Sequence, residues 1–485
     1  MIQNGTVKME FIGRKAELAR LREINELARA SVGGYLTMIT GRRRIGKTTL
    51  VKHFLEQNNI PNCYFFVSRK QPKAMLVEFT ELLTQQFPEI SGLQFANFDG
   101  FFKFLFQTLE RKNYTFVFDE FQNFLYVDAS VFSIVQKYWD EYKDKIKGHI
   151  IVIGSLQTVM HTLFEDQKEP LFKRLTGKMI LKPFSVAEMN SLFAQQTELN
   201  QGEKLKLQLL FNGIPFYYYL MERENLFGKD IIEIIQRLAL RNDGLLFNEG
   251  KELTIEEFGK NYGRYFSILE AIASGFTQWN DISTHTGILP NSIGKYLDEL
   301  LNYYDLIERK SSVFSRDEGK SNRYYLKDNF LTFWFRYVHK NFSLLENYSG
   351  DAIIPKVKAD LPNFFGVQFE KLILDWLQRQ CIEKPNQFPF DVVGKYWDRG
   401  QNEIDLLAYQ EKGDLCLIGE CKLSSKRITS AIVNQFQEQS EIISKKRRFK
   451  TYRKAVFVGD VSPDDLKISL QGKGIEIFDV TNYFD

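Results

Sequence analysis

The sequence contains little cysteine and no long apolar run. Its four cysteines, at positions 63, 381, 416 and 421, form no C-x-x-C pair and have no histidine at ligand spacing. This pattern argues against a disulfide framework and against a zinc site, and it predicts a reducing, cytoplasmic location. No apolar run reaches the roughly 18 residues that a membrane span needs, and the first residues lack the apolar core of a signal peptide. We therefore expect a soluble, unprocessed protein with no membrane partner.

An excess of charge of one sign is also missing. The formal net charge is +3 for 485 residues, so any basic surface that binds nucleic acid must be local. The chain is 44% hydrophobic and 26% charged, which is typical of a globular protein. Its length suggests roughly three domains at about 150 residues each.

The most specific motif is a phosphate-binding loop. Residues 41–50, GRRRIGKTTL, contain the pattern G-x-x-x-x-G-K-[ST] between an apolar, strand-like run at 35–40 and a helix-like segment at 48–56. The two glycines let backbone N–H groups curl around an anion at a helix N-terminus. Lys47 is expected to meet the β and γ phosphates and Thr48 to ligate Mg²⁺. The expected nucleotide-binding residues of the loop are Gly41, Arg42, Arg43, Arg44, Ile45, Gly46, Lys47, Thr48 and Thr49. The alternative is a solvated turn with an accidental Gly-Lys-Thr, and the three arginines are either solvated or contacts for a partner.

A second strand supplies the carboxylates that a nucleotide hydrolase needs. Residues 114–120, YTFVFDE, predict an apolar strand that ends in Asp119 and Glu120. We expect Asp119 to hold Mg²⁺ and Glu120 to activate the attacking water. A third apolar strand, at 150–155, ends in Gly154 and Ser155 and is a candidate for a polar contact near the γ phosphate. For both strands the alternative is an ordinary solvated strand end.

Several motifs in order resemble one ATPase group. They are FIGR at 11–14, the phosphate loop, FDEFQ at 118–122, PLFKRLTGKMILKPF at 170–184 and GIP at 213–215. Together they are similar to the archaeal-type, AAA+-related P-loop ATPases of the STAND group.

The resemblance implies ATP and Mg²⁺ as cofactors and ATPase activity. It further implies that Arg174 serves the γ phosphate, that Pro215 caps a helical lid beside the nucleotide, and that Ile12 lies close to the adenine. Arg174 acting on another copy would require a homo-oligomer. Without the resemblance, Arg174 is one basic residue on a solvated helix face.

Residues 262–338 predict three helices followed by two strands around a turn at 317–319, the order of a winged helix. The third helix would be the one that enters DNA. Lys295 is nearly its only cation, and Asp298 and Glu299 lie beside it, whereas phosphate binding needs lysine and arginine. We therefore favour a role in domain packing over DNA binding.

A different chemistry follows the polar stretch 347–363, which we expect to be a linker. NEIDLLAY at 402–409 and LCLIGECK at 415–422 predict a β-hairpin that brings Asp405 toward Glu420 and Lys422. Two acidic groups on one metal ion and a lysine near the attacking hydroxide suit phosphodiester cleavage. The spacing D-x14-E-x-K is similar to the PD-(D/E)xK nuclease superfamily, although Ile404 stands where that family has proline.

The nuclease resemblance implies that Glu370, in the preceding helix, joins Asp405 and Glu420 as a metal ligand, with a second Mg²⁺ or Mn²⁺. The alternative is a solvated hairpin with charged ends. Downstream, KKRRFKTYRK at 445–454 suits a surface that follows phosphates, and a solvated face fits it almost as well.

We thus expect a multidomain α/β protein. Its predicted parts are a P-loop ATPase core with a parallel sheet (1–182), a helical lid (183–255), a winged helix (256–345) and an α/β restriction-endonuclease-like domain (346–485). The expected function is an ATPase whose nucleotide state controls a metal-dependent nuclease that acts on DNA or RNA. The alternative is a regulatory NTPase switch whose C-terminal domain binds nucleic acid or a protein without cleaving. The expected catalytic residues are Lys47, Glu120, Arg174, Glu420 and Lys422.

Overall fold

The computed structural model describes residues 11–30, 33–196, 199–258, 262–315, 322–347, 350–398 and 402–480. The chain forms two compact units. The first unit runs to Glu188 and also takes in two short later segments, Ile214–Tyr219 and Asn302–Asp305. The second unit contains the remaining residues through the C-terminus. The finer division into four domains stays a prediction. None of the described helices combines the length and apolar character that a bilayer crossing requires.

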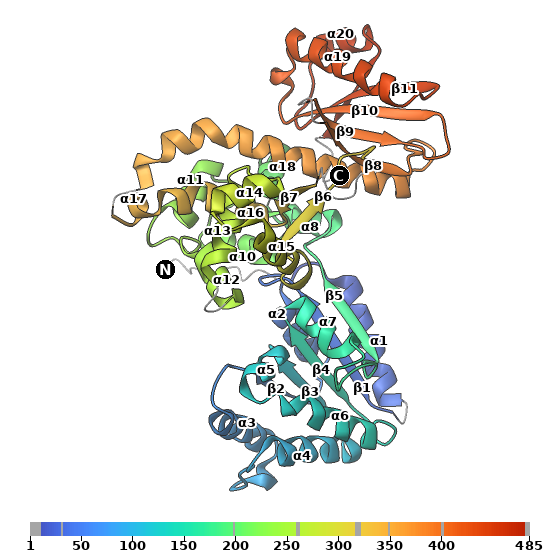
Figure 1. Ribbon diagram of the computed structural model, residues 1–485. Helices are drawn as coiled ribbons and strands as arrows, with labels where there is room; N and C mark the ends of the chain where they lie inside the picture. Colours follow the sequence, from blue (N-terminus) through green and yellow to red (C-terminus); the bar gives the residue numbers. More distant parts are fainter. Residues whose placement is uncertain are drawn as a thin grey trace, which may run out of the picture. The chain divides into compact units, whose positions relative to one another are not determined.

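A five-stranded parallel sheet organises the first unit, with the strand order β2-β3-β4-β1-β5 (Figure 1). The strands are β1 (Tyr35–Gly41), β2 (Asn62–Phe66), β3 (Thr115–Asp119), β4 (His149–Gly154) and β5 (Gly177–Leu181). The helical segments are α1 (Lys15–Ala30), α2 (Lys47–Gln57), α3 (Pro72–Gln86), η1 (Pro88–Ile90), α4 (Phe98–Arg111), η2 (Phe121–Asn123), α5 (Phe124–Val127), α6 (Ser130–Tyr142), α7 (Gln157–Glu165) and α8 (Val186–Ala194), which begins in this unit.

Helices cover both faces of this sheet, which explains why its central strands are continuously apolar. Side chains from α1 and α2 pack on one face in a core that includes Leu21, Leu50 and Phe54. On the other face, α3, α4, α6 and α7 enclose an aromatic core around Phe65 and Phe101, whose ring centroids lie 5.4 Å apart. Because all five strands are parallel, their carboxyl ends lie along one edge of the sheet, where open α/β folds place their chemistry.

The second unit begins with helices and a short hairpin. Its helical segments up to the hairpin are α9 (Gln201–Phe211), α11 (Ile231–Ile235), η3 (Gln236–Leu240), α12 (Glu249–Phe258), α13 (Tyr262–Ala273), α14 (Trp279–Thr286) and α15 (Pro290–Asp298). Two further segments, α10 (Pro215–Arg223) and η5 (Glu299–Tyr303), begin or end in the first unit. Strands β6 (Ile307–Lys310) and β7 (Arg323–Leu326) then pair antiparallel. Three helices and a two-stranded pair thus follow in the expected order, and the expected turn at 317–319 lies outside the described residues.

The segment expected to be a linker is helical for much of its length. After α16 (Asn329–Phe333), η6 (Trp334–Val338), η7 (His339–Asn341), α17 (Phe342–Asn347) and η8 (Gly350–Ala352), helix α18 runs without interruption over Ile354–Glu383. A proline stands in the first turn of α18, where the missing N–H has no partner to lose, and Val357 and Leu361 are buried. The linker prediction is therefore wrong from residue 354 onward.

A mixed sheet with the order β12-β11-β10-β9-β8 closes the second unit. Its strands are β8 (Val392–Trp397), β9 (Glu403–Tyr409), β10 (Leu415–Lys422), β11 (Thr451–Val458) and β12 (Ile475–Asp479), with η9 (Ser425–Arg427), α19 (Ser430–Lys446) and α20 (Asp464–Gln471) between them. Strands β8, β9 and β10 are antiparallel, while β10, β11 and β12 are parallel. The expected hairpin across 402–422 is confirmed.

Candidate functional site

The phosphate loop lies at the carboxyl edge of the first sheet, between β1 and α2. Gly46 has φ 89° and precedes Lys47, the first residue of α2. A Cβ built on Gly46 meets no atom within 4 Å, so the space in front of the helix N-terminus is open. At Gly41, by contrast, a Cβ would approach the carbonyl oxygen of Leu181 to 2.7 Å. One glycine therefore provides the left-handed turn, and the other a close approach of two strands.

Lys47 is held against the loop itself. Its Nζ donates to the carbonyl oxygens of Gly41 at 2.8 Å and Arg42 at 3.0 Å. The residue is 6% exposed, so the ammonium group is fixed at the loop. A cation held at a helix N-terminus that also presents backbone N–H groups suits a phosphate.

Thr48 and Asp119 meet as the motif requires. The Thr48 hydroxyl donates to Asp119 Oδ2 at 2.6 Å, which joins the loop to the end of β3 across the intervening strand β4. The Tyr64 hydroxyl donates to the same oxygen at 2.6 Å. Burial, together with the Asp119 charge, raises the pKa of Tyr64, so this group stays protonated and remains a donor. A hydroxyl and a carboxylate that converge beside an open phosphate loop fit an Mg²⁺ ion with its nucleotide.

Glu120 occupies a constrained position beyond Asp119. It has φ 57° and ψ 42°, a left-handed conformation that is uncommon outside glycine and is concentrated at functional positions. The Ser155 hydroxyl, just past β4, lies 3.0 and 2.8 Å from the two carboxylate oxygens, and Gln122 Nε2 also donates to this carboxylate. The expected base and the polar end of the third strand are thus in direct contact.

Other expected nucleotide-binding residues flank the loop. Arg14 Nη2 donates to the carbonyl oxygen of Ile45 at 3.0 Å, which ties the FIGR segment and its buried Ile12 to the loop. The Arg44 guanidinium lies 4.1 Å from the ring centroid of Phe216, which follows Pro215 at the start of α10. Arg44 therefore contacts the residue that follows the GIP segment.

Arg174 lies away from this edge. It precedes β5, whereas the phosphate loop follows β1, and the two strands are parallel, so Arg174 is at the opposite edge of the sheet. Its guanidinium pairs with Asp140 of α6 at 2.9 Å and donates to the carbonyl oxygen of Phe172 at 2.6 Å. Within one chain the structure does not bring Arg174 to the phosphate loop. Its expected role requires a second copy.

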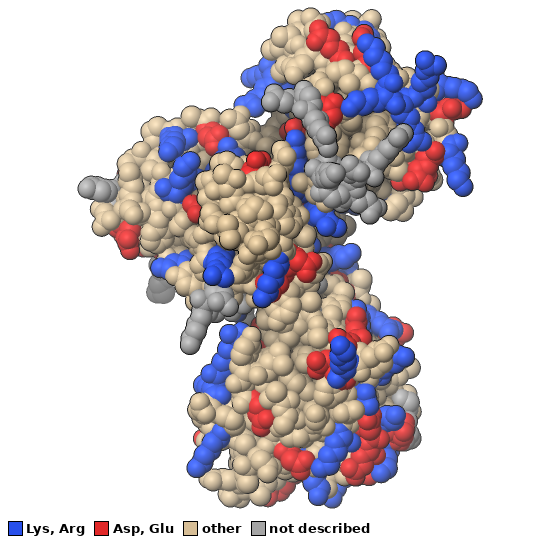
Figure 2. Space-filling model, in the orientation of Figure 1, with Lys and Arg blue, Asp and Glu red and all other residues tan. Residues whose placement is uncertain are grey.

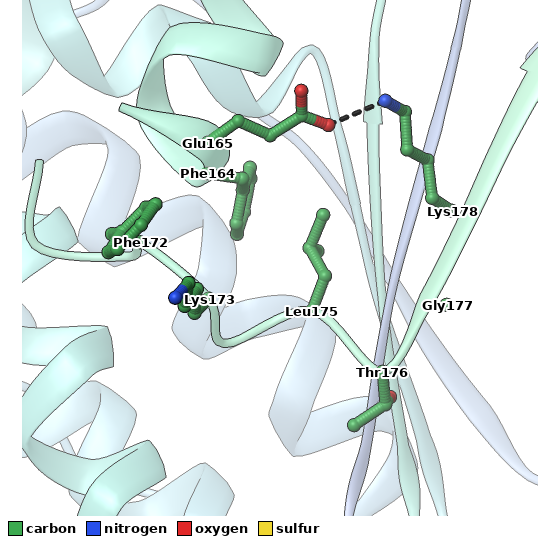
Figure 3. Close-up of a pocket in the computed structure, with 8 residues that line it drawn as sticks. All are labelled: Phe164, Glu165, Phe172, Lys173, Leu175, Thr176, Gly177 and Lys178. Atoms are coloured by element: carbon green, nitrogen blue, oxygen red, sulfur yellow. Dashed lines mark hydrogen bonds and ion pairs between the residues drawn. The ribbon is translucent and has the colours of Figure 1, made fainter. Parts of the chain in front are cut away.

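The segment around Arg174 borders a cavity of about 340 Å³ at the amino end of β5 (Figure 3). Phe164, Leu175 and Thr176 line it, together with an ion pair between Lys178 and Glu165 at 2.5 Å. The cavity is remote from the phosphate loop along β5, so it takes no part in the site described here.

The acidic residues of the C-terminal domain form a second cluster. Asp405 on β9 accepts a hydrogen bond from the backbone N–H of Cys421 at 3.0 Å, which fixes it beside β10. Lys422 Nζ contacts Glu420 and lies 3.9 Å from Asp405 Oδ2. The expected convergence of Asp405, Glu420 and Lys422 is therefore present in the structure.

Glu370 joins this cluster through Lys395, a residue that no motif in the sequence indicates. Lys395 Nζ on β8 lies 2.5 Å from Glu370 Oε2 and 3.6 Å from Glu403 Oε1. Both Lys395 and Glu403 flank the motif, but strand alternation alone did not show that β8 would pair with β9. The pairing places Trp397 opposite Glu403 and brings Lys395 to the same group of side chains.

Burial and mutual charge set the protonation of the cluster. Burial, then the charge of Asp405, raises the pKa of Glu370 to about 7 and raises the pKa of Glu420 above its usual range. Burial lowers the pKa of Lys395 and Lys422, but the neighbouring carboxylates outweigh it and the net pKa of both is raised. Both lysines therefore carry a positive charge at neutral pH. Among the residues that the structure describes, no group of three or more His, Cys, Asp or Glu side chains could hold a metal ion.

The hairpin β6–β7 is attached to the C-terminal domain. Arg323 Nη1 lies 3.2 Å from Glu403, and Glu308 lies 3.4 Å from Lys371 of α18. The third helix, α15, carries the exposed Lys295, 3.9 Å from Glu299. These contacts support the packing role that the sequence favours for this region.

Three of the seven cations at 445–454 form ion pairs with described acidic side chains of the domain. Lys446 lies 2.9 Å from Asp398, Lys450 lies 2.5 Å from Asp414, and Arg453 lies 2.8 Å from Glu476. Figure 2 shows Lys and Arg side chains gathered on the C-terminal domain near β11. Acidic partners therefore offset part of the positive charge of this surface.

Two family models match parts of this chain. Residues 34–190 match the AAA domain family, and residues 334–435 match a family described as archaea bacterial proteins of unknown function. An uncharacterized protein of Methanocaldococcus jannaschii is 29% identical over 419 residues, which cover 85% of this chain and 87% of that protein.

One solved structure shows the same fold at a TM-score above 0.5. The Walker-type ATPase of Pyrococcus abyssi superposes with a TM-score of 0.52 at 20% identity, covering 67% of this chain and 96% of that one. The ORC2 protein of Aeropyrum pernix, solved in ADPNP–ADP complexes, has a TM-score of 0.46 at 17% identity and covers 74% of this chain and 98% of its own. The parallel sheet, the AAA match and the Pyrococcus abyssi structure show that the first unit has the P-loop NTPase fold, and the AAA match supports nucleotide binding and hydrolysis. The C-terminal part is an α/β domain with a mixed sheet.

Proposed function

We propose that this chain is an ATPase whose nucleotide state controls a metal-dependent nuclease formed by its C-terminal domain. The observation that carries the ATPase part is the meeting of Thr48, Asp119, Glu120 and Ser155 at the carboxyl edge of one parallel sheet. In this proposal Lys47 and the loop N–H groups hold the phosphates. Thr48 and Asp119 would hold Mg²⁺, whose positive charge would neutralise the phosphates, and Glu120 would take the proton of the attacking water.

The nuclease part rests on the geometry of Asp405, Glu420 and Lys422. Two carboxylates on neighbouring strands would hold one divalent ion, and the Lys422 ammonium beside them would stabilise the attacking hydroxide and the charge on the phosphate. The order of elements is consistent with a nuclease site, because Glu370 lies on helix α18, which precedes the three antiparallel strands. DNA or RNA is the substrate class that we propose.

A second function has its own supporting observation. Since no three described His, Cys, Asp or Glu side chains could together hold a metal ion, a C-terminal domain that binds nucleic acid or a protein without cleaving is the alternative. The chain would then be a regulatory NTPase switch.

ATP binding gives the first test. We expect Lys47→Ala to weaken binding of a fluorescent ATP analogue by about 10- to 100-fold, because it removes a charged contact to phosphate. Lys73→Ala, which removes an exposed lysine from α3, is the control and should bind like the wild type. Equal affinities for Lys47→Ala and wild type would remove the basis of the ATPase proposal.

A further inference from the structure

The C-terminal cluster contains two lysines, whereas its sequence motif has one. Four carboxylates take part, and each lysine contacts two of them. Lys422 contacts Glu420 and Asp405, while Lys395 lies between Glu370 and Glu403. The side chain of Lys395 is 13% exposed and that of Glu370 is 20% exposed, so this second pair is largely removed from solvent.

An irregularity in the sheet places Lys395 at the cluster. Gly394 pairs with Leu407 and Tyr396 pairs with Ile404, so Lys395 stands opposite two residues of β9 instead of one. One of those two residues is Asp405. Bulges of this kind occur next to active sites, where they change the direction of a side chain.

Neighbouring elements fix the position of Lys395. Its carbonyl oxygen accepts a hydrogen bond from the backbone N–H of Val313 at 2.8 Å, and Ser312 Oγ accepts one from the N–H of Trp397 at 2.8 Å. Arg323 of β7 holds the partner carboxylate Glu403 at 3.2 Å from both oxygens and lies 4.6 Å from the ring centroid of Trp397. The segment after β6 and strand β7 therefore position both Lys395 and Glu403.

We propose that Lys395 takes the place of a second metal ion in the C-terminal site. This inference rests on the proposed nuclease function. One divalent ion is then held by Asp405 and Glu420, and Lys395 neutralises charge on the substrate phosphate from the side of Glu370. Two-metal sites place a cation on each side of the reacting phosphate, and lysine binds phosphate as a point charge. Lys395 makes and breaks no covalent bond, and Glu370 becomes a partner of Lys395 instead of the metal ligand that the sequence predicts.

The number of bound Mn²⁺ ions tests this assignment without measuring activity. The probe is Mn²⁺ titrated into the full-length, nucleotide-free chain and followed by electron paramagnetic resonance. We expect Lys395→Met to bind one more Mn²⁺ per chain than the wild type, because Glu370 loses the ammonium group that it contacts and becomes available to a metal. Lys395→Arg keeps the charge and should bind the wild-type number. An unchanged number in Lys395→Met, with a wild-type thermal unfolding midpoint, would overturn the inference.

A second variant keeps the test decisive if Lys395→Met does not fold. Glu370→Gln should leave the number of bound Mn²⁺ at the wild-type value, since Glu370 is paired with Lys395. A lost ion in Glu370→Gln would show that Glu370 is a metal ligand and would refute the assignment. Asp405→Asn tests the metal site of the proposed nuclease independently of the role of Lys395. If it binds as many ions as the wild type, the metal site of the proposed nuclease fails, whatever Lys395 does.

Discussion

Glu120→Gln is expected to bind ATP with wild-type affinity and to hydrolyse it about 100- to 1,000-fold more slowly. The amide has the same shape as the carboxylate and still accepts the hydrogen bond from Ser155, but it cannot take a proton from water. The substitution therefore lowers the rate of ATP turnover and leaves ATP binding unchanged. Steady-state phosphate release and equilibrium ATP binding, measured on the same preparation, separate the two effects.

The matched control for this substitution is Glu56→Gln, which changes an exposed glutamate of α2 in the same way. It should hydrolyse ATP at the wild-type rate. If Glu120→Gln also turned over normally, Glu120 would not be the base, and its contacts with Ser155 and Gln122 would be structural only.

Lys422→Ala is expected to lower nicking of DNA or RNA in Mg²⁺ or Mn²⁺ by about 100- to 1,000-fold. The substitution removes the ammonium group beside Glu420 and Asp405, so charge that develops on the phosphate is no longer stabilised. Supercoiled plasmid and labelled single-stranded RNA cover the substrate class. The assay counts only cleavage that a chelator abolishes.

Lys426→Ala removes an exposed lysine four residues further along the chain and serves as the control. It should cleave like the wild type. Equal chelator-sensitive cleavage by wild type and Lys422→Ala would rule out the C-terminal cluster as the source and favour the switch without cleavage.

Local sequence motifs predict most of the nucleotide site. The phosphate loop has a length fixed by its pattern, and Asp119 and Glu120 end a buried strand, so parallel pairing suffices to bring them to one edge. The approach of the Tyr64 hydroxyl to Asp119 was not predicted, because it depends on β2 lying next to β3. Adjacency of parallel strands is set by crossover connections that no spacing in the chain reveals.

The sequence predicts only part of the C-terminal cluster. Asp405, Glu420 and Lys422 lie on a hairpin, where register follows from a short turn. Lys395 enters through the bulge in β8–β9 and through backbone contacts from residues 312–313, which are more than 80 residues away in the chain. The first ten residues of α18 read as part of a linker because they are polar and contain two prolines, whereas burial of Val357 and Leu361 stabilises them as a helix.

Control of the C-terminal domain by nucleotide is the central claim, and one rate comparison tests it most directly. Chelator-sensitive nicking by Glu120→Gln is measured without nucleotide and with saturating ATP, which this variant binds but hydrolyses slowly. We expect the two rates to differ by about fivefold or more, the lower range of coupling between linked sites. Equal rates in both states, from a chain that binds ATP and cleaves, would contradict control of the nuclease by the ATPase.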